Sequence, residues 1–230
     1  MTNPAEQSRQ RGILRLKHHR EQHEARAEEM AEMSPRFERL AQATAAPRVV
    51  TSFNLFQTPP HIAAQMAGLF ADHPAPASGP LNWLEPSAGL GRLYTAARTW
   101  TATNEPHHQH DFTLVDVSRD LCEELYRMTE PPHQPAHLIC GDFMAQDPQK
   151  LGQFHRIVMN PPFKNGTDIK HIQHARKFLA PGGRIVALCA AGPRQHRDLY
   201  PIATTWQILP ARSFRSEGTA VDVVLLTIDG

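Results

Sequence analysis

From residue 81 onward, short apolar runs alternate with helix-like stretches, and this alternation constrains the fold more than any other feature of the 230-residue chain. The expected strands are LNWLEP, DFTLVDV, HLICGDF, RIVMNPP and GGRIVALCAA. The expected helices are LGRLYTAARTW, RDLCEELYRM and DIKHIQHARKFL. Apolar strands of this length, separated by helices, predict a parallel sheet that is covered on both faces.

The two ends of this pattern complete the expected domain. An apolar helix follows Thr58-Pro59-Pro60 and runs through Ile62 to Phe70. The chain closes with two strand-like runs, TTWQIL and AVDVVLLTI, with no helix expected between them, which predicts an antiparallel hairpin. We therefore expect an α/β fold with a doubly wound, seven-stranded sheet, in which six strands are parallel and the last is antiparallel.

The first fifty residues follow a different pattern. Residues 5–32 are highly charged and contain no proline, which predicts a helix, and Ser34-Pro35 predicts the start of a second one. The apolar stripe of the first helix is thin, so a mobile arm and an arm that packs against a partner, a second copy included, both remain open. We expect a helical arm over residues 1–50 and one domain over residues 51–230.

Composition excludes several classes of protein. Hydrophobic residues make up 40% and charged residues 20% of the chain, which excludes wholesale disorder. No stretch approaches the ~20 apolar residues of a membrane-spanning helix, and the N-terminus lacks the apolar core of a signal peptide. Cys122, Cys140 and Cys189 fit neither a disulfide framework nor a CxxC zinc site, so we expect a cytoplasmic protein with these cysteines in its core.

Charge is divided unevenly along the chain, although the net charge is only +1. Residues 51–154 hold five Lys or Arg and eleven Asp or Glu, whereas residues 155–215 hold ten Lys or Arg and two Asp or Glu. The basic stretch indicates a polyanionic partner; basic residues that merely solvate helix faces are the alternative.

A glycine-containing turn, Glu85-Pro86-Ser87-Ala88-Gly89-Leu90-Gly91, follows the first expected strand. Gly89 and Gly91 allow the backbone to approach a ligand closely at the carboxyl edge of a sheet. The third glycine of a dinucleotide fingerprint would fall at position 94, which holds Tyr94, so that fingerprint is incomplete. Glycines that serve only a tight turn remain an alternative.

Acidic residues end the next two strands. Asp116 closes DFTLVDV and can accept hydrogen bonds from both hydroxyls of a ribose. Asp142 follows HLICG and can accept a hydrogen bond from an adenine amino group, and the Phe143 ring can stack on the adenine. Together with the glycine turn, these residues indicate a site shaped for adenosine.

The most specific motif is Asn160-Pro161-Pro162-Phe163, which follows the strand RIVM. An Asn side-chain oxygen and a Pro carbonyl can accept two hydrogen bonds from one exocyclic NH2 and stabilise the positive charge that develops as this amine attacks. The Phe163 ring then offers a face on which a planar base can stack. A simple turn at the sheet edge is the alternative.

These motifs, in this order, resemble those of class I S-adenosylmethionine-dependent methyltransferases, and in particular the gamma-type DNA adenine-N6 group with its small phage and plasmid members. The resemblance covers residues 50–230 and implies a Rossmann-like fold, S-adenosylmethionine as cofactor, and methylation of adenine N6 in DNA. The cofactor-binding residues that it implies are Phe56, Thr58, Glu85, Pro86, Ser87, Ala88, Gly89, Gly91, Asp116, Asp142 and Phe143. The catalytic residues that it implies are Asn160, Pro161, Pro162 and Phe163.

Two departures from that group keep other functions open. The group usually carries a separate target-recognition domain, for which the chain leaves no room after its last strand. The NPPF motif also occurs in ribosomal RNA guanine-N2 methyltransferases. An RNA methyltransferase acting on guanine N2 or adenine N6, and an inactive module that binds cofactor or nucleic acid, are therefore the alternatives.

The remaining expectations concern the substrate rim and metals. Basic residues after the catalytic motif and after the fifth strand can contact a nucleic-acid backbone, and the candidates are Lys164, Lys170, Arg194 and Arg197. His107, His108 and His110 lie in a proline-containing stretch without an acidic or Cys partner at ligand spacing, so we expect no metal there.

Overall fold

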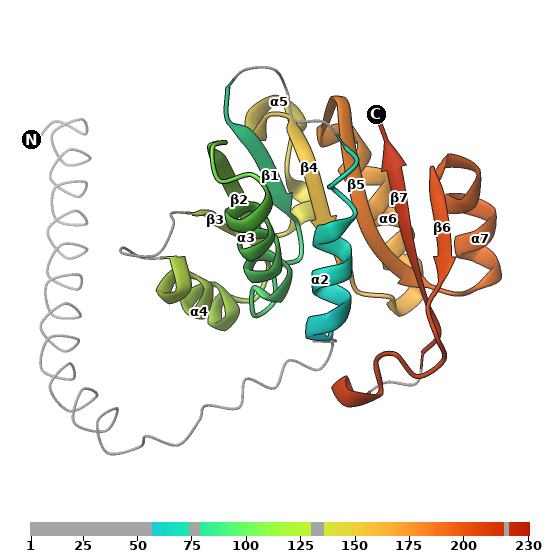
Figure 1. Cartoon of the computed structure of the whole chain (residues 1–230). Coiled ribbons are helices and arrows are strands. Elements are labelled where there is room, and N and C mark those ends of the chain that lie inside the picture. The colour runs from blue at the N-terminus through green and yellow to red at the C-terminus, as the bar shows by residue number, and fades with distance from the viewer. Residues whose placement is uncertain (1–56, 74–78, 130–135, 219–220) are drawn as a thin grey trace, which may run out of the picture. The chain divides into compact units, whose positions relative to one another are not determined.

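The computed structural model describes residues 57–73, 79–129, 136–218 and 221–230, which form a single seven-stranded sheet with helices on both faces (Figure 1). The strand order is β3-β2-β1-β4-β5-β7-β6. The strands are β1 (Leu81–Glu85), β2 (His110–Asp116), β3 (Ala136–Cys140), β4 (Phe154–Met159), β5 (Leu179–Ala190), β6 (Thr205–Ile208) and β7 (Val223–Asp229).

Strand directions match the expectation from sequence. The pairings of β1 with β2 and β4, of β2 with β3, and of β4 with β5 are parallel. The last strand, β7, is antiparallel to both β5 and β6. The prediction of six strands in one direction and an antiparallel last strand is therefore confirmed.

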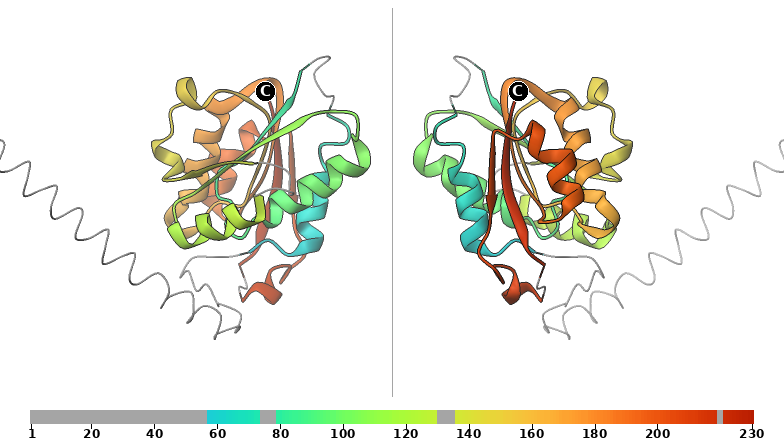
Figure 2. Two further views of the ribbon diagram at one scale, coloured as in Figure 1. Left: turned by 90° about the vertical axis from the view of Figure 1, so that its left-hand side faces the viewer. Right: turned by 90° about the vertical axis from the view of Figure 1, so that its right-hand side faces the viewer.

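Six helices connect or flank these strands in the part of the chain that the structure describes. They are α2 (Pro60–Gly68), α3 (Arg92–Asn104), α4 (Arg119–Thr129), α5 (Pro148–Leu151), α6 (Thr167–Ala175) and α7 (Pro193–Leu199). Side chains from α2, α3 and α4 pack into one hydrophobic cluster, and those from α6 and α7 pack into another. Helices α2 and α3 lie on one face of the sheet and α6 on the other, as the side views show (Figure 2).

The strands contribute to the two clusters in alternation, as the period of two along a strand requires. In β1, Trp83 packs into the cluster of α2 and α3, whereas its neighbour Leu84 packs into the cluster of α6. In β4, Val158 packs into the cluster of α2 and α3, whereas its neighbour Ile157 packs into the cluster of α6. Because both faces are covered, the centres of the strands are mostly apolar, which is why the sequence shows continuous apolar runs there.

Helix α7 was not expected from the sequence, where residues 193–199 were interpreted only as a basic rim. Its sequence, PRQHRDL, has few apolar residues, and only Gln195 and Leu199 are buried. Pro193 at its first position is the local signal that a helix begins there, since proline is favoured at that position.

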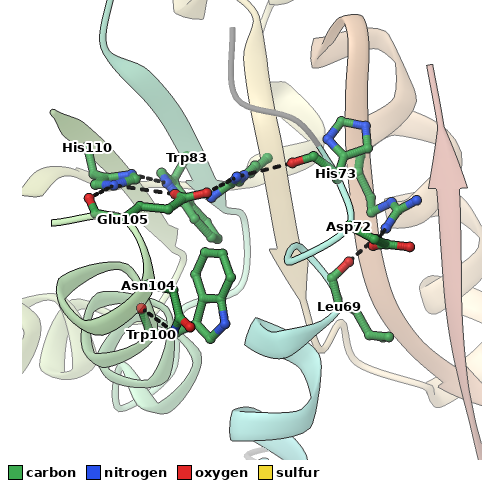
Figure 3. A network of polar contacts seen from close by, with 10 residues as sticks. Leu69, Asp72, His73, Trp83, Trp100, Asn104, Glu105 and His110 are labelled. Atoms are coloured by element: carbon green, nitrogen blue, oxygen red, sulfur yellow. Dashed lines mark hydrogen bonds and ion pairs between the residues drawn. The ribbon is translucent and has the colours of Figure 1, made fainter. Parts of the chain in front are cut away.

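A buried ion pair connects the end of α3 to the centre of the sheet (Figure 3). The Arg156 guanidinium, fully buried in β4, donates to both carboxylate oxygens of Glu105 at 2.7 Å. It also lies 5.0 Å from the Trp83 ring and 5.3 Å from the Trp100 ring. His110, the last histidine of the proline-containing stretch, begins β2 and accepts a hydrogen bond from the Trp83 indole at 3.1 Å.

Part of the positive charge of the basic stretch, residues 155–215, is paired within the fold. Arg156 is buried, Arg184 forms ion pairs with Asp229 and Asp72, and Arg197 pairs with Asp198. These three arginines balance charges within the fold. The cysteine expectation also needs one correction: Cys122 and Cys189 are buried, but Cys140 is exposed at the end of the edge strand β3.

Two further expectations concern the N-terminal arm and membrane-spanning helices. The helical arm predicted over residues 1–50 lies outside the described residues. Within the described ranges, none of the helices combines the length and the apolar character that crossing a bilayer requires.

Candidate active site

A pocket of about 400 Å³ opens where the carboxyl ends of β1, β2, β3 and β4 meet. Crevices at this edge are where open parallel sheets bind ligands. All of the predicted catalytic residues line it, namely Asn160, Pro161, Pro162 and Phe163. The predicted cofactor residues that line it are Thr58, Glu85, Pro86, Ser87, Ala88, Gly89, Asp116, Asp142 and Phe143. Phe56 lies outside the described residues.

The turn after β1 is held by the acid at the end of β2. The Gly89 N–H donates to Asp116 Oδ2 at 2.8 Å, and the Ser118 N–H donates to Oδ1 of the same carboxylate at 2.8 Å. Gly89 adopts a positive φ of 56°, which glycine accepts without strain. Asp116 therefore fixes two loops on one side of the pocket.

Gly91 has a different role from the one that its place in the motif suggests. It does not line the pocket. It precedes α3 with a φ of 70°, and a Cβ at this position would lie 3.0 Å from Leu125 Cδ2 and 3.2 Å from Met128 Cε. Glycine is needed here because α3 and α4 pack closely.

Glu85, the last residue of β1, is buried in the pocket wall with 3% of its surface exposed. Its Oε2 atom has no hydrogen-bond partner among the described residues. Burial raises the pKa of the Glu85 carboxyl well above its usual range, a hydrogen bond from the Tyr94 backbone lowers it, and the Asp116 charge raises it further. The unpaired Oε2 atom is thus a position that a hydrogen-bonding group of a ligand would satisfy.

Asp142 and Phe143 follow β3 and line the side of the pocket next to the end of that strand. Asp142 Oδ1 accepts a hydrogen bond from the Met144 N–H at 2.8 Å and caps the 3-10 turn Phe143–Ala145. The Phe143 ring is 2% exposed and packs against Phe178, with centroids 5.3 Å apart. The ring is therefore already engaged in the core, and its predicted stacking on adenine stays a prediction.

The predicted catalytic motif, residues 160–163, is tied to the segment before α2. Asn160 Nδ2 donates a hydrogen bond to the Thr58 hydroxyl at 3.1 Å, and Thr58 is 4% exposed. Asn165 and Gly166 then adopt positive φ values of 58° and 73° and turn the chain from the motif into α6. Asn tolerates this left-handed region better than most residues do.

A buried carboxylate holds the first turn of α6. Asp168 is fully buried, and its Oδ2 accepts hydrogen bonds from the Ala190 N–H at 3.0 Å and from Gln195 Nε2 at 3.0 Å. Its Oδ1 accepts from the Ile169 N–H at 3.0 Å. Asp168 therefore joins the helix after the catalytic loop to the end of β5 and to α7.

Several pocket residues were not among the predicted site residues, and three of them, Gln57, Val117 and His171, stand out by their burial or exposure. Both side-chain polar atoms of Gln57, and Nδ1 of His171, are buried without a hydrogen-bond partner in the described chain. Burial lowers the pKa of His171, so the ring is neutral near pH 7. Val117 exposes 74% of its surface beside Asp116; a large apolar residue directly after the acid was the available sequence signal.

The predicted substrate rim lies outside the pocket. Lys164, Lys170, Arg194 and Arg197 are exposed, and none of them lines the pocket. Arg194 lies against Gly166, where a Cβ would be 3.7 Å from its Nη1 atom. Arg197 donates two hydrogen bonds to its neighbour Asp198. Among the described side chains, no cluster of His, Cys, Asp and Glu could hold a metal ion.

Solved structures share the fold of this chain at low sequence identity. The chain superposes with a TM-score of 0.58 on a protein from Pyrococcus horikoshii that is provisionally assigned as an RNA methyltransferase, at 15% identity and covering 83% of this chain and 95% of that one. The TM-score is 0.61 for the methyltransferase subunit of a type I restriction-modification system from Streptococcus thermophilus, at 15% identity over 75% of this chain and 44% of that one.

A third solved structure, from Listeria monocytogenes, is provisionally assigned as a class I S-adenosylmethionine-dependent methyltransferase. It gives a TM-score of 0.59 at 15% identity, covering 79% of this chain and 63% of that one. The present chain thus spans less than two thirds of the Streptococcus and Listeria proteins.

Sequence comparison gives the family. No curated protein matches the chain. Residues 87–200 match the family model of the methyltransferase small domain, and this range contains most of the pocket and the catalytic motif. Residues 87–200 thus match the methyltransferase small domain, and the sheet that carries them has the Rossmann-like fold typical of methyltransferases that use S-adenosylmethionine.

Proposed function

We propose that the chain methylates an exocyclic amine of a nucleic-acid base, with adenine N6 in DNA as the first candidate, and that residues 51–230 form the catalytic domain. The observation that carries the proposal is the placement of Asn160, which follows β4, lines the pocket and is held by Thr58 at 3.1 Å. Its amide nitrogen is engaged by Thr58, which makes the amide oxygen the atom that accepts from a substrate amine.

The wall near Gln57 and Glu85 fits the methionine end of S-adenosylmethionine, which carries an ammonium and a carboxylate. Glu85 Oε2 is a buried acceptor without a partner, and the Gln57 amide offers both a donor and an acceptor that are unpaired among the described residues. A pocket of about 400 Å³ is within the usual range for small-molecule sites. The cofactor supplies an electrophilic methyl group on a sulfonium sulfur.

The side of the pocket lined by Asp116, Val117 and Asp142 fits an adenosine group. Asp116 already accepts two backbone N–H groups, and a carboxylate has about four lone-pair sites, so its oxygens can also accept from ribose hydroxyls. The exposed Val117 side chain gives an apolar surface for a planar ring. Asp142 can accept from an amino group at the edge of that ring.

Catalysis then rests on positioning and on charge stabilisation. The Asn160 amide oxygen and the Pro161 carbonyl hold the two hydrogens of the amine, and the positive charge that grows on its nitrogen is stabilised by both acceptors. The half-buried Phe163 ring supports the base from the side. Asp168 keeps the helix after this loop in place, so the acceptors are ordered before the substrate arrives.

Charge and fold relatives both support a nucleic-acid substrate. Residues 155–215 hold ten Lys or Arg against two Asp or Glu, and the exposed ones include Lys164 and Arg194 near the pocket. One structural relative is provisionally assigned as an RNA methyltransferase, and another belongs to a restriction-modification system. Methylation of RNA, at guanine N2 or adenine N6, is the second candidate for this reason.

Product identification tests the proposal. The full chain is incubated with cofactor carrying a labelled methyl group and with DNA or RNA in parallel, and the nucleic acid is digested to nucleosides for mass analysis. We expect labelled N6-methyl-2′-deoxyadenosine from the DNA arm. Labelled N2-methylguanosine or N6-methyladenosine from the RNA arm would transfer the assignment to the second candidate. Label in neither nucleic acid would refute both.

A further inference from the structure

The loop between β6 and β7 lies at the same edge of the sheet as the pocket. It extends past the first residues of α2, on the side toward which the arrows of β4 and β6 point (Figures 1 and 2). Leu209 and Phe214 anchor it: they are 4% and 1% exposed and belong to the same hydrophobic cluster as Ile62 and Met66 of α2. The loop is therefore a packed part of the domain.

An ion pair joins this loop to the pocket wall. Arg92 lines the pocket, and its Nη1 atom donates to Glu217 Oε1 at 2.9 Å and to the Thr58 carbonyl at 3.1 Å. Thr58 is also the residue that holds Asn160. The loop, the pocket wall and the Asn160 amide are thus connected through three consecutive contacts.

Two arginines of this loop, Arg212 and Arg215, are exposed. The Arg215 N–H donates to the Arg212 carbonyl at 2.9 Å, which closes a turn, and Arg212 has a positive φ of 66°. No ion pair engages either guanidinium within the described ranges. Glu217 is paired with Arg92, and the other acid of the loop, Asp222, forms no ion pair with Arg212 or Arg215 among the described residues, so neither guanidinium is neutralised by a carboxylate of the loop.

We propose that Arg212 and Arg215 bind the phosphodiester backbone of the nucleic acid next to the base that enters the pocket. The inference rests on the proposed function and adds the surface that positions the strand. Guanidinium groups suit this task because their planar donors match phosphate oxygens, and such contacts fix the register of the substrate without reading its sequence. Neither arginine was among the rim residues expected from sequence.

The test uses the full chain and measures the binding of labelled duplex DNA and labelled single-stranded RNA by fluorescence anisotropy over a series of salt concentrations. The variant is Arg212→Gln with Arg215→Gln, which keeps the side-chain length and removes both charges. Each lost phosphate contact lowers the slope of log K against log salt by about 0.9 for duplex DNA and about 0.7 for single strands. We therefore expect the slope to fall by about 1.8 on DNA or about 1.4 on RNA.

Two controls separate charge from folding. Arg176→Gln with Lys177→Gln removes two exposed charges after the far end of α6 and should leave the slope unchanged. Arg212→Lys with Arg215→Lys keeps the charge and should keep the slope. Calorimetric titration with S-adenosylmethionine should give the same affinity for every variant, which shows that the pocket is intact.

The outcomes distinguish this inference from the proposed function. Wild-type binding to either nucleic acid with an unchanged slope in the double Gln variant would overturn the role of the loop and leave the proposed function standing. Absence of wild-type binding to both nucleic acids would overturn the proposed function and the loop assignment together.

Discussion

The Asn160 amide donates a hydrogen bond to the Thr58 hydroxyl across 102 positions of sequence, and this contact joins the catalytic motif to the segment that leads into α2. Thr58 also accepts a hydrogen bond from Arg92 through its carbonyl. One buried threonine therefore holds the orientation of the amide and one wall of the pocket.

Thr58→Val should lower kcat because it removes the hydroxyl that orients Asn160. A hydrogen bond of this kind contributes about 1 kcal/mol, so we expect a decrease of roughly five- to tenfold in single-turnover methylation. Thr58→Ser keeps the hydroxyl and should retain most of the activity. Equal rates for the Val and Ser variants would show that the hydrogen bond does not matter for catalysis.

Asp142→Ala should weaken the binding of S-adenosylmethionine. The loss of one hydrogen bond between an ionised group and a neutral partner costs about 1.5–3 kcal/mol, or roughly tenfold or more in Kd. Asp142→Asn keeps the oxygen that caps Met144 and serves as the structural control. A Kd unchanged in the Ala variant, measured by calorimetry, would place Asp142 outside the site.

Glu85→Gln should stabilise the protein without cofactor and weaken cofactor binding. Burial raises the pKa of Glu85 in the folded state, so the native protein keeps the proton on this carboxyl to a higher pH than the unfolded chain does. The free energy of unfolding therefore falls as the pH rises above 4.5, the ordinary pKa of the group. The variant removes this loss. Urea unfolding at pH 5 and pH 8 should show that the advantage of the variant grows with pH, and an advantage confined to pH 5 would contradict the burial argument.

Glu105→Ala should destabilise the fold because it leaves the Arg156 guanidinium buried without its carboxylate. Breaking a buried pair from one side typically costs about 3–5 kcal/mol in the free energy of unfolding. Glu124→Ala, which removes an exposed pair with Arg127, is the matched control and should change stability by less than about 1 kcal/mol. If urea unfolding shows a similar loss of unfolding free energy for the two variants, the buried pair does not stabilise the fold more than an exposed pair does.

The strands and the ligand edge could be predicted from the sequence because their signals are local. Each apolar run is long enough to identify a buried strand, and the acids and glycines at the strand ends fall at one edge of any parallel sheet. The turn before α3, Asp116, Asp142 and Asn160 therefore came together in the pocket as expected.

The missed features depend on contacts between distant positions. Arg156 and Glu105 are 51 positions apart, and nothing near either residue shows that the charge is buried. Arg212 and Arg215 become candidates only once Glu217 is seen paired with Arg92, 125 positions away. Gln57 and His171 are polar residues next to recognised motifs, and only the structure shows their atoms to be buried and unpaired.

The most direct test of the account is the effect of Asn160→Ala on two quantities measured side by side, the rate of methyl transfer to nucleic acid and the affinity for S-adenosylmethionine. Removing an acceptor that acts in the transition state should lower kcat by about 100-fold or more and change the cofactor Kd by less than about twofold. Asn104→Ala, at the exposed end of α3, should change neither. Full turnover in the Asn160→Ala variant would contradict the assignment of this site.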